Sequence, residues 1–161
     1  MDKEAVLRKQ LVALLHGGQA HMTFDDAVKD FPMSHINTYP PNVTYTPWHL
    51  IEHIRITQWD ILDFIRNPSY KEMEWPKSYW PDPKSKATPE QWQTTIHGYH
   101  KDLKDMEAIA DNPNTDLYSP IAHGDGQTIL REIMLVADHT AYHTGELGIL
   151  RQVILAWPDQ R

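Results

Sequence analysis

The stretch ADHTAYHTGE, residues 137–146, places His139 and His143 four residues apart near the end of the chain. Apolar residues recur around it at helical spacing and predict one long helix from about Gln127 to Ala156. Residues four apart project from the same side of a helix, so both imidazoles can bind one metal ion without distorting the backbone. Such a pair is more often structural than metal-binding, so a third histidine is needed to decide.

Three further long helices precede this one, covering about residues 3–16, 46–67 and 88–112. The second and third begin at Thr-Pro pairs, where threonine is a favoured N-cap and proline suits the first helical position. A short helical piece is expected after Thr23. We see no strand alternation and no internal repeat. The sequence therefore predicts an all-α chain, a single domain over residues 1–161 folded as a four-helix bundle with long loops.

Composition excludes several classes of function. The net charge of −7 and the absence of a dense Lys/Arg run argue against binding to nucleic acid. The chain has no cysteine, which excludes disulfides, thiolate zinc sites and a cysteine nucleophile. Neither a signal peptide nor a membrane-spanning apolar run is visible, so we expect a cytoplasmic protein that does not bind membranes. Ten histidines are an excess that calls for an explanation.

The third histidine is expected from the helix over residues 46–67. On a helical projection, His53 lies on the flank of the apolar face, roughly 100° from its centre, and His49 lies further towards solvent, at roughly 140°. His53 can therefore reach a groove between helices more easily than His49. The other histidines are predicted to lie mostly in loops or on the surface, with His21 the one that could approach the site: His16, His21, His35, His97, His100 and His123.

Two stretches resemble the DinB-like superfamily of metal-dependent four-helix-bundle proteins. The last helix matches its pattern of two histidines followed by Gly and Glu, here His139, His143, Gly145 and Glu146. The stretch TPWHLIEHIRITQWDIL is similar to that family's second helix, and the histidine that matches is His53. The resemblance extends over nearly the whole chain, including the helix order. It implies a bundle that is often a homodimer and one divalent ion held by His53, His139 and His143.

Three neutral imidazoles would leave a coordination position open on such an ion. The resemblance implies either a hydrolase or an S-transferase that uses a low-molecular-weight thiol, acting on a small molecule. Zn or Ni is the expected ion. Glu146, one turn from His143, is the candidate catalytic residue, and Thr57 and Asp60 share the side of His53 and are expected near the pocket. Asp138 and Glu52 are instead expected on solvated helix faces.

Two alternatives stay open at this point. The chain could be a non-catalytic protein in which the metal is structural, closed by a fourth ligand such as His49 or His21, or in which the pocket only binds a small molecule. It could also be an interaction module without metal. The proline- and aromatic-rich segment 68–87 is predicted to pack on the domain, either as a lid or as a plain connection.

Overall fold

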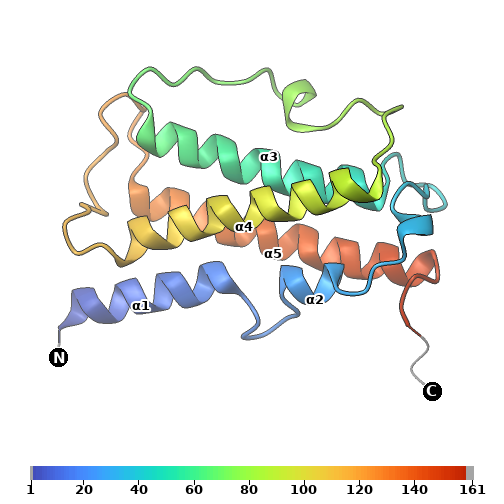
Figure 1. Ribbon diagram of the computed structural model, residues 1–161. Helices are drawn as coiled ribbons and strands as arrows, with labels where there is room; N and C mark the ends of the chain where they lie inside the picture. Colours follow the sequence, from blue (N-terminus) through green and yellow to red (C-terminus); the bar gives the residue numbers. More distant parts are fainter. Residues whose placement is uncertain (1, 159–161) are drawn as a thin grey trace.

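A computed structural model of the chain describes residues 2–158 (Figure 1). Within this range the chain is helical, and no strand forms beyond one isolated bridge between Pro120 and Thr128. The prediction of an all-α chain is confirmed. The elements are four long helices, α1 (Lys3–His16), α3 (Pro47–Arg66), α4 (Pro89–Asp111) and α5 (Ile129–Val153), the short helix α2 (Phe24–Val28), and two 3-10 turns, η1 (Met33–His35) and η2 (Lys77–Tyr79).

Threonines set the starts of α2, α3 and α4, as the sequence predicts. The side chains of Thr23, Thr46 and Thr88 each accept a hydrogen bond from a backbone N–H in the first turn, and each start is a capping box. The last helix is shorter than predicted. It ends at Val153 because Leu155 has a φ of 56°, a left-handed conformation that cannot continue an α-helix.

The four long helices pack side by side. α3 contacts both α4 and α5, and α1 contacts the same two helices from the other side. Figure 1 shows that α3 and α4 run in the same direction, whereas α1 and α5 run in the opposite one. α3 and α5 are therefore antiparallel neighbours, which brings the second turn of α3 close to the middle of α5.

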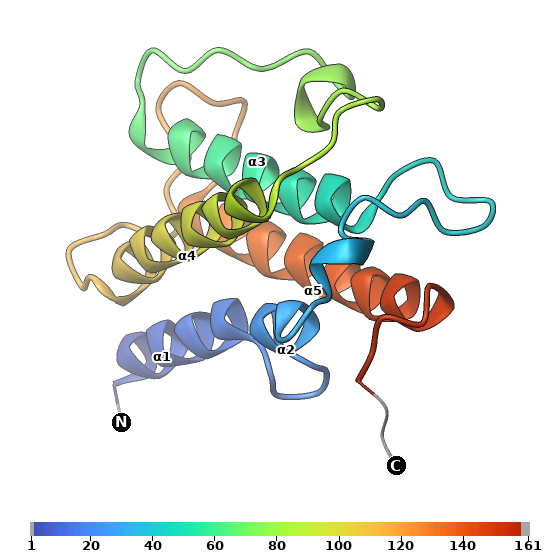
Figure 2. The same ribbon diagram turned by 45° about the vertical axis from the view of Figure 1, so that its right-hand side comes forward.

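The direction of α3 and α4 explains the long segment between them. Because these neighbours are parallel, the chain must return along the whole length of α3, roughly 30 Å for its 20 residues, before α4 can begin. Segment 67–88, which we call the crossover, runs back along the outer side of α3 in both views (Figures 1 and 2). The crossover is thus long for a topological reason, and it covers one side of α3.

An arginine lies inside the apolar core at the end of α5. Arg151 is completely buried, and its guanidinium donates to the backbone carbonyls of Ala27, Asp30 and Ala156 at 3.0 Å each. The same group lies over the ring of Trp157, 4.1 Å from its centroid. Arg151 therefore joins α5 to α2 and to the chain that follows each of them.

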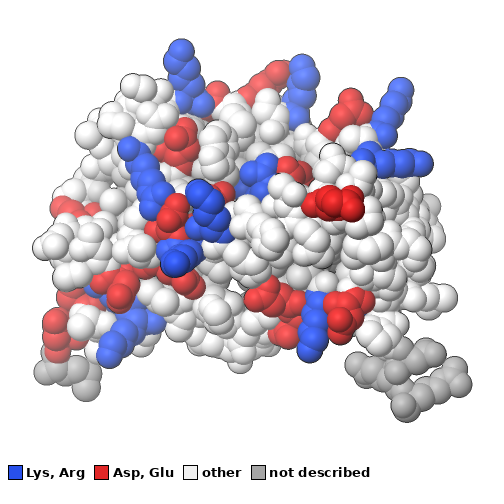
Figure 3. Space-filling view, viewed as in Figure 1, with Lys and Arg blue, Asp and Glu red and all other residues white. Residues whose placement is uncertain are grey.

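The outer surface carries charges of both signs. On the face shown in Figure 3, acidic and basic side chains are interspersed, so this face lacks the continuous basic area typical of a nucleic-acid-binding surface. Among residues 2–158, no helix combines the length and the hydropathy that crossing a membrane requires.

Candidate metal centre

Three histidines from two helices meet between α3 and α5. His53 is buried, His139 and His143 are half-buried, and one ring nitrogen of each lies within 4.8 Å of the others. The ring centroids are 4.5–4.9 Å apart. The structure therefore brings together the three residues predicted as metal ligands, and they are close enough to hold one ion. Within residues 2–158, no further histidine or carboxylate joins this cluster.

Hydrogen bonds fix the tautomers of two of these rings. His53 Nδ1 lies 2.8 Å from the carbonyl oxygen of Tyr79, and His143 Nδ1 lies 2.7 Å from Glu146 Oε2. Both partners are acceptors, so each Nδ1 carries the proton and each Nε2 presents a lone pair. Metal-binding histidines are usually oriented in this way by an acceptor at the second ring nitrogen.

The spacing of one pair of nitrogens suits a tetrahedral ion. His53 Nε2 and His139 Nε2 are 3.1 Å apart. Two Zn–N bonds of about 2.0–2.1 Å at the tetrahedral angle would place their nitrogens about 3.3 Å apart. The observed separation is therefore close to that of two ligands on one ion. The same distance also fits a hydrogen bond, in which His139 Nε2–H donates to His53 Nε2.

The crossover packs on the domain, as predicted for segment 68–87, and it lies directly against the three histidines. The indole of Trp80 stacks on the imidazole of His53, with centroids 3.9 Å apart and planes 5° from parallel, and the neighbouring Tyr79 supplies the carbonyl that orients His53. The sequence predicts that aromatic residues of this segment pack on the domain. It does not predict which helix they cover, because irregular segments have no periodicity from which to read a face.

Glu146 is held between two neighbours. One carboxylate oxygen accepts from His143 Nδ1, and the other accepts a hydrogen bond from the hydroxyl of Tyr45. The structure thus places the predicted catalytic residue in contact with a histidine of the cluster, in the position of a group that orients that ring. Tyr45 is not predicted as a site residue, because it lies in an irregular loop before α3. The one feature that could have pointed to it is its position next to Thr46, the N-cap of the helix that carries His53.

Asp60 lies two turns from His53 along α3 and is bound by tyrosines. It is buried, and it accepts hydrogen bonds from Tyr79 at 2.8 Å and from Tyr70 at 3.0 Å. Burial raises the pKa of the Asp60 carboxyl, although both tyrosines oppose this shift. Asp60 therefore anchors Tyr79, whose carbonyl orients His53. Thr57, also predicted near the pocket, is half-buried, and its hydroxyl has no hydrogen-bond partner among the described residues.

The prediction for His49 is wrong. It is buried rather than turned towards solvent, because its Nδ1 accepts from the backbone N–H of Thr46 and its Nε2 faces the Ser85 carbonyl at 3.0 Å. The crossover covers this side of α3, which a projection of one helix cannot reveal. With both nitrogens occupied, His49 is not a fourth ligand. His21 is exposed and bonded to the Met22 carbonyl, so it does not approach the cluster either.

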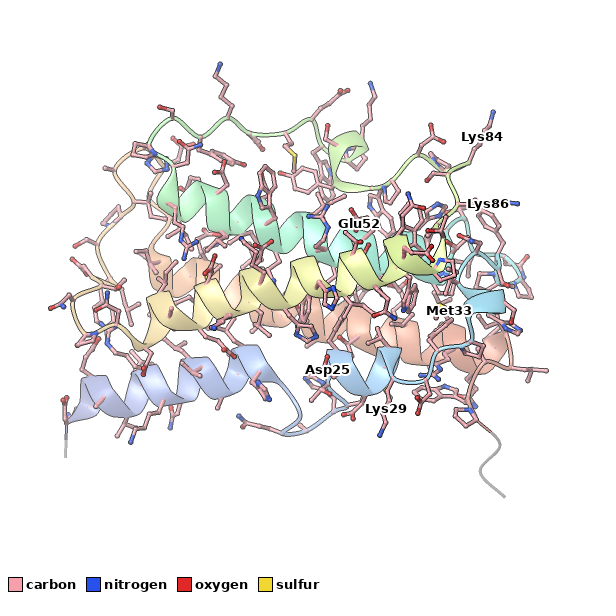
Figure 4. All side chains as sticks on the ribbon, viewed as in Figure 1. Asp25, Lys29, Met33, Glu52, Lys84 and Lys86 are labelled. Atoms are coloured by element: carbon pink, nitrogen blue, oxygen red, sulfur yellow. The ribbon has the colours of Figure 1, made fainter. Side chains whose placement is uncertain are left out.

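Two acidic residues near the cluster have different surroundings. Asp138 is exposed, as predicted. Glu52, labelled in Figure 4, faces α4 instead of solvent and accepts from the Thr95 hydroxyl of that helix at 2.7 Å. It also pairs at 2.6 Å with Arg55, one turn further along α3. The expectation of a solvated face is therefore wrong for Glu52, because α4 packs against that side of α3. Neither carboxylate contacts the three histidines.

Burial and mutual proximity keep the imidazoles neutral. Burial is the larger cause for both rings on α5, and the neighbouring histidines add to it. Together they lower the pKa of His139 from 6.5 to about 3 and that of His143 to about 4. Burial also lowers the pKa of His53. Only the neutral ring can bind a metal, so at neutral pH an ion does not have to compete with conversion of these rings to imidazolium.

Metal-free protein is expected to lose stability as the pH falls from about 6.5 to about 4. In this window a histidine of the unfolded chain binds a proton, whereas His139 and His143 of the folded chain do not, because their pKa values are lower. The unfolded chain therefore binds more protons, and the free energy of unfolding must fall with pH. Urea titrations of chelator-treated protein at several pH values would measure this slope. A double variant, His139→Gln with His143→Gln, should show a smaller slope, and an unchanged slope would contradict the assignment.

Comparisons of the chain with protein-family models, with curated proteins and with solved structures find no match. The resemblance to the DinB-like superfamily stays a prediction that depends on the two motifs described above. The geometry of the three histidines stands independently of it.

Proposed function

We propose that the chain is a divalent-metal-dependent enzyme whose ion is held by His53, His139 and His143, and that its bundle is of the DinB-like type. One observation carries the proposal. Three imidazole nitrogens lie within 4.8 Å of one another with no fourth protein ligand among the described residues. A three-histidine set of this kind is typical of catalytic sites, because one position stays free for water or substrate.

A divalent ion bound here, with Zn²⁺ or Ni²⁺ proposed, would supply a Lewis acid that favours hydroxide from bound water or thiolate from a bound thiol. Bound hydroxide would serve a hydrolase, and bound thiolate would serve a thiol S-transferase, each acting on a small molecule. In both cases the chain's own part is to hold the metal-binding histidines in place. Tyr79 and Glu146 each accept an Nδ1 proton, and Trp80 shields the face of His53.

We also propose a homodimer. Three large apolar side chains on the outer side of α5 support it, since Tyr142, Ile149 and Val153 are 50–70% exposed. Exposed apolar residues grouped on one element are typical of protein interfaces. Sedimentation of the purified protein, alone and with Ile149→Asp, is a direct measurement of the assembly.

The experiment that tests the function is elemental analysis of protein free of an affinity tag. We expect about one divalent ion per chain after dialysis. Reconstitution with Co²⁺ should then give the visible absorption of a four-coordinate ion, and added thiol should change that absorption if the thiol binds the open position. An unchanged Co²⁺ spectrum would favour the hydrolase. Protein that holds no Zn²⁺, Ni²⁺ or Co²⁺ would refute the proposal.

Replacing Glu146 by alanine is expected to weaken metal binding by about 10–100-fold, because His143 loses the acceptor that fixes its ring. Competition with a chelator would measure the affinity. Asp138→Ala is the matched control, since it removes an exposed carboxylate next to His139 from the same helix. Equal affinities in the two variants would show that Glu146 does not orient the site.

A further inference from the structure

A pocket of about 370 Å³ lies between the crossover and the loop that precedes α3. Two aromatic rings, those of Tyr45 and Trp80, form part of its wall, together with Pro76, Pro81 and Pro83. Pockets of a few hundred cubic ångströms with mainly apolar and aromatic walls are the usual form of small-molecule sites.

The same two rings contact the metal centre. Trp80 stacks on His53, and Tyr45 donates its hydroxyl proton to Glu146, the partner of His143. Tyr45 and Trp80 also contact each other, with ring centroids 5.1 Å apart. Both rings therefore touch a histidine of the cluster, or its hydrogen-bonding partner, and also line the pocket.

The lining carries little charge. No carboxylate lines the pocket, and its one lysine, Lys77, lies 3.5 Å from Glu74. Burial lowers the pKa of His49, so this ring is neutral at pH 7. Lys84 and Lys86 belong to the same crossover, but they do not line the pocket, and their side chains point outward in Figure 4. Aromatic and proline rings, with a single lysine that is paired with Glu74 on the surface, favour a flat, uncharged ligand.

We propose that this pocket binds a flat, uncharged ring of the substrate and places the reactive group of that substrate at the three histidines. The inference rests on the proposed function for its second half only. It predicts two measurable properties, which are binding of an aromatic molecule at Tyr45 and Trp80 and closeness of that molecule to the ion.

The probe is para-fluorobenzamide, a flat uncharged molecule with a fluorine NMR signal. We expect Zn²⁺-loaded protein to broaden this signal, and Co²⁺-loaded protein to broaden it further through paramagnetic relaxation. Thr44→Asp and Pro83→Asp each place a carboxylate in the exposed part of the pocket lining and should weaken probe binding about tenfold. Two variants are used so that the test still works if one of them folds poorly. Circular dichroism would show whether each variant is folded.

Leu14→Asp is the matched control. It introduces the same charge at an exposed apolar residue of α1, outside the pocket lining, and should leave probe binding unchanged. Absence of broadening by the wild type, or a loss with Leu14→Asp rather than with Thr44→Asp and Pro83→Asp, would overturn the pocket assignment. Equal broadening in the Zn²⁺ and Co²⁺ forms would overturn the link to the ion. If the protein takes up neither ion, the proposed function fails. Broadening of the probe signal by metal-free protein would then still show whether the pocket binds the probe.

Discussion

Replacing His139 by alanine is expected to abolish stoichiometric metal binding. A bound structural zinc contributes about 10–16 kcal/mol shared among its ligands, so the loss of one ligand of three should weaken the affinity by a hundredfold to a thousandfold or more, on the order of several kcal/mol. The remaining pair, His53 and His143, belongs to two helices and cannot complete the site. Elemental analysis after dialysis, with a chelator competition for the affinity, measures the effect. His53→Ala should behave in the same way.

The control is His97→Ala, because His97 is an exposed histidine on α4. It removes an imidazole without touching the cluster and should keep the metal content of the wild type. If His139→Ala retained one ion per chain, the ion would have to bind elsewhere, and the proposed centre would be wrong. Circular dichroism of all three variants would separate loss of a ligand from loss of the fold.

Arg151→Met is expected to cause the largest loss of stability. Methionine fills much of the space but donates no hydrogen bond, so three carbonyl oxygens, those of Ala27, Asp30 and Ala156, lose their donor. Each buried unsatisfied group costs about 1–3 kcal/mol, and the contact with Trp157 is lost as well. We expect a decrease of about 3–5 kcal/mol in the free energy of unfolding, measured by urea denaturation.

The comparison for this prediction is Arg66→Met. Arg66 is partly exposed and pairs with Asp105 at 2.9 Å, an arrangement that contributes less than about 1 kcal/mol. A similar loss in the two variants would show that the buried hydrogen bonds of Arg151 contribute no more than a surface ion pair.

Local signals in the sequence predicted the long helices and singled out the three histidines as candidates. The Thr-Pro pairs at Thr46 and Thr88 predict helix starts because capping depends only on neighbouring residues. The spacing of His139 and His143 predicts their common direction for the same reason. The helical projection also ranks His53 above His49 as a ligand, and the structure brings His53 to the cluster.

Contacts between segments that are distant in the sequence could not be predicted from these local signals. His49 is buried because Ser85 and its neighbours cover it, and Glu52 turns to α4 instead of solvent because it accepts a hydrogen bond from Thr95. Tyr45 reaches Glu146 from a loop 101 residues earlier in the chain. Each of these contacts depends on how the crossover and the helices are placed in three dimensions, and no periodicity within one segment encodes that placement.

The parallel course of α3 and α4 gives two parts of this protein different roles. Helices α3 and α5 carry the three histidines, and the crossover that joins α3 to α4 forms part of the surroundings of these histidines. The crossover orients His53 through the backbone carbonyl of Tyr79, and the side chain of the same residue is bonded to Asp60 of α3. A change elsewhere in the sequence of the crossover would therefore reshape the surroundings of the three histidines while the two helices that present them stay in place.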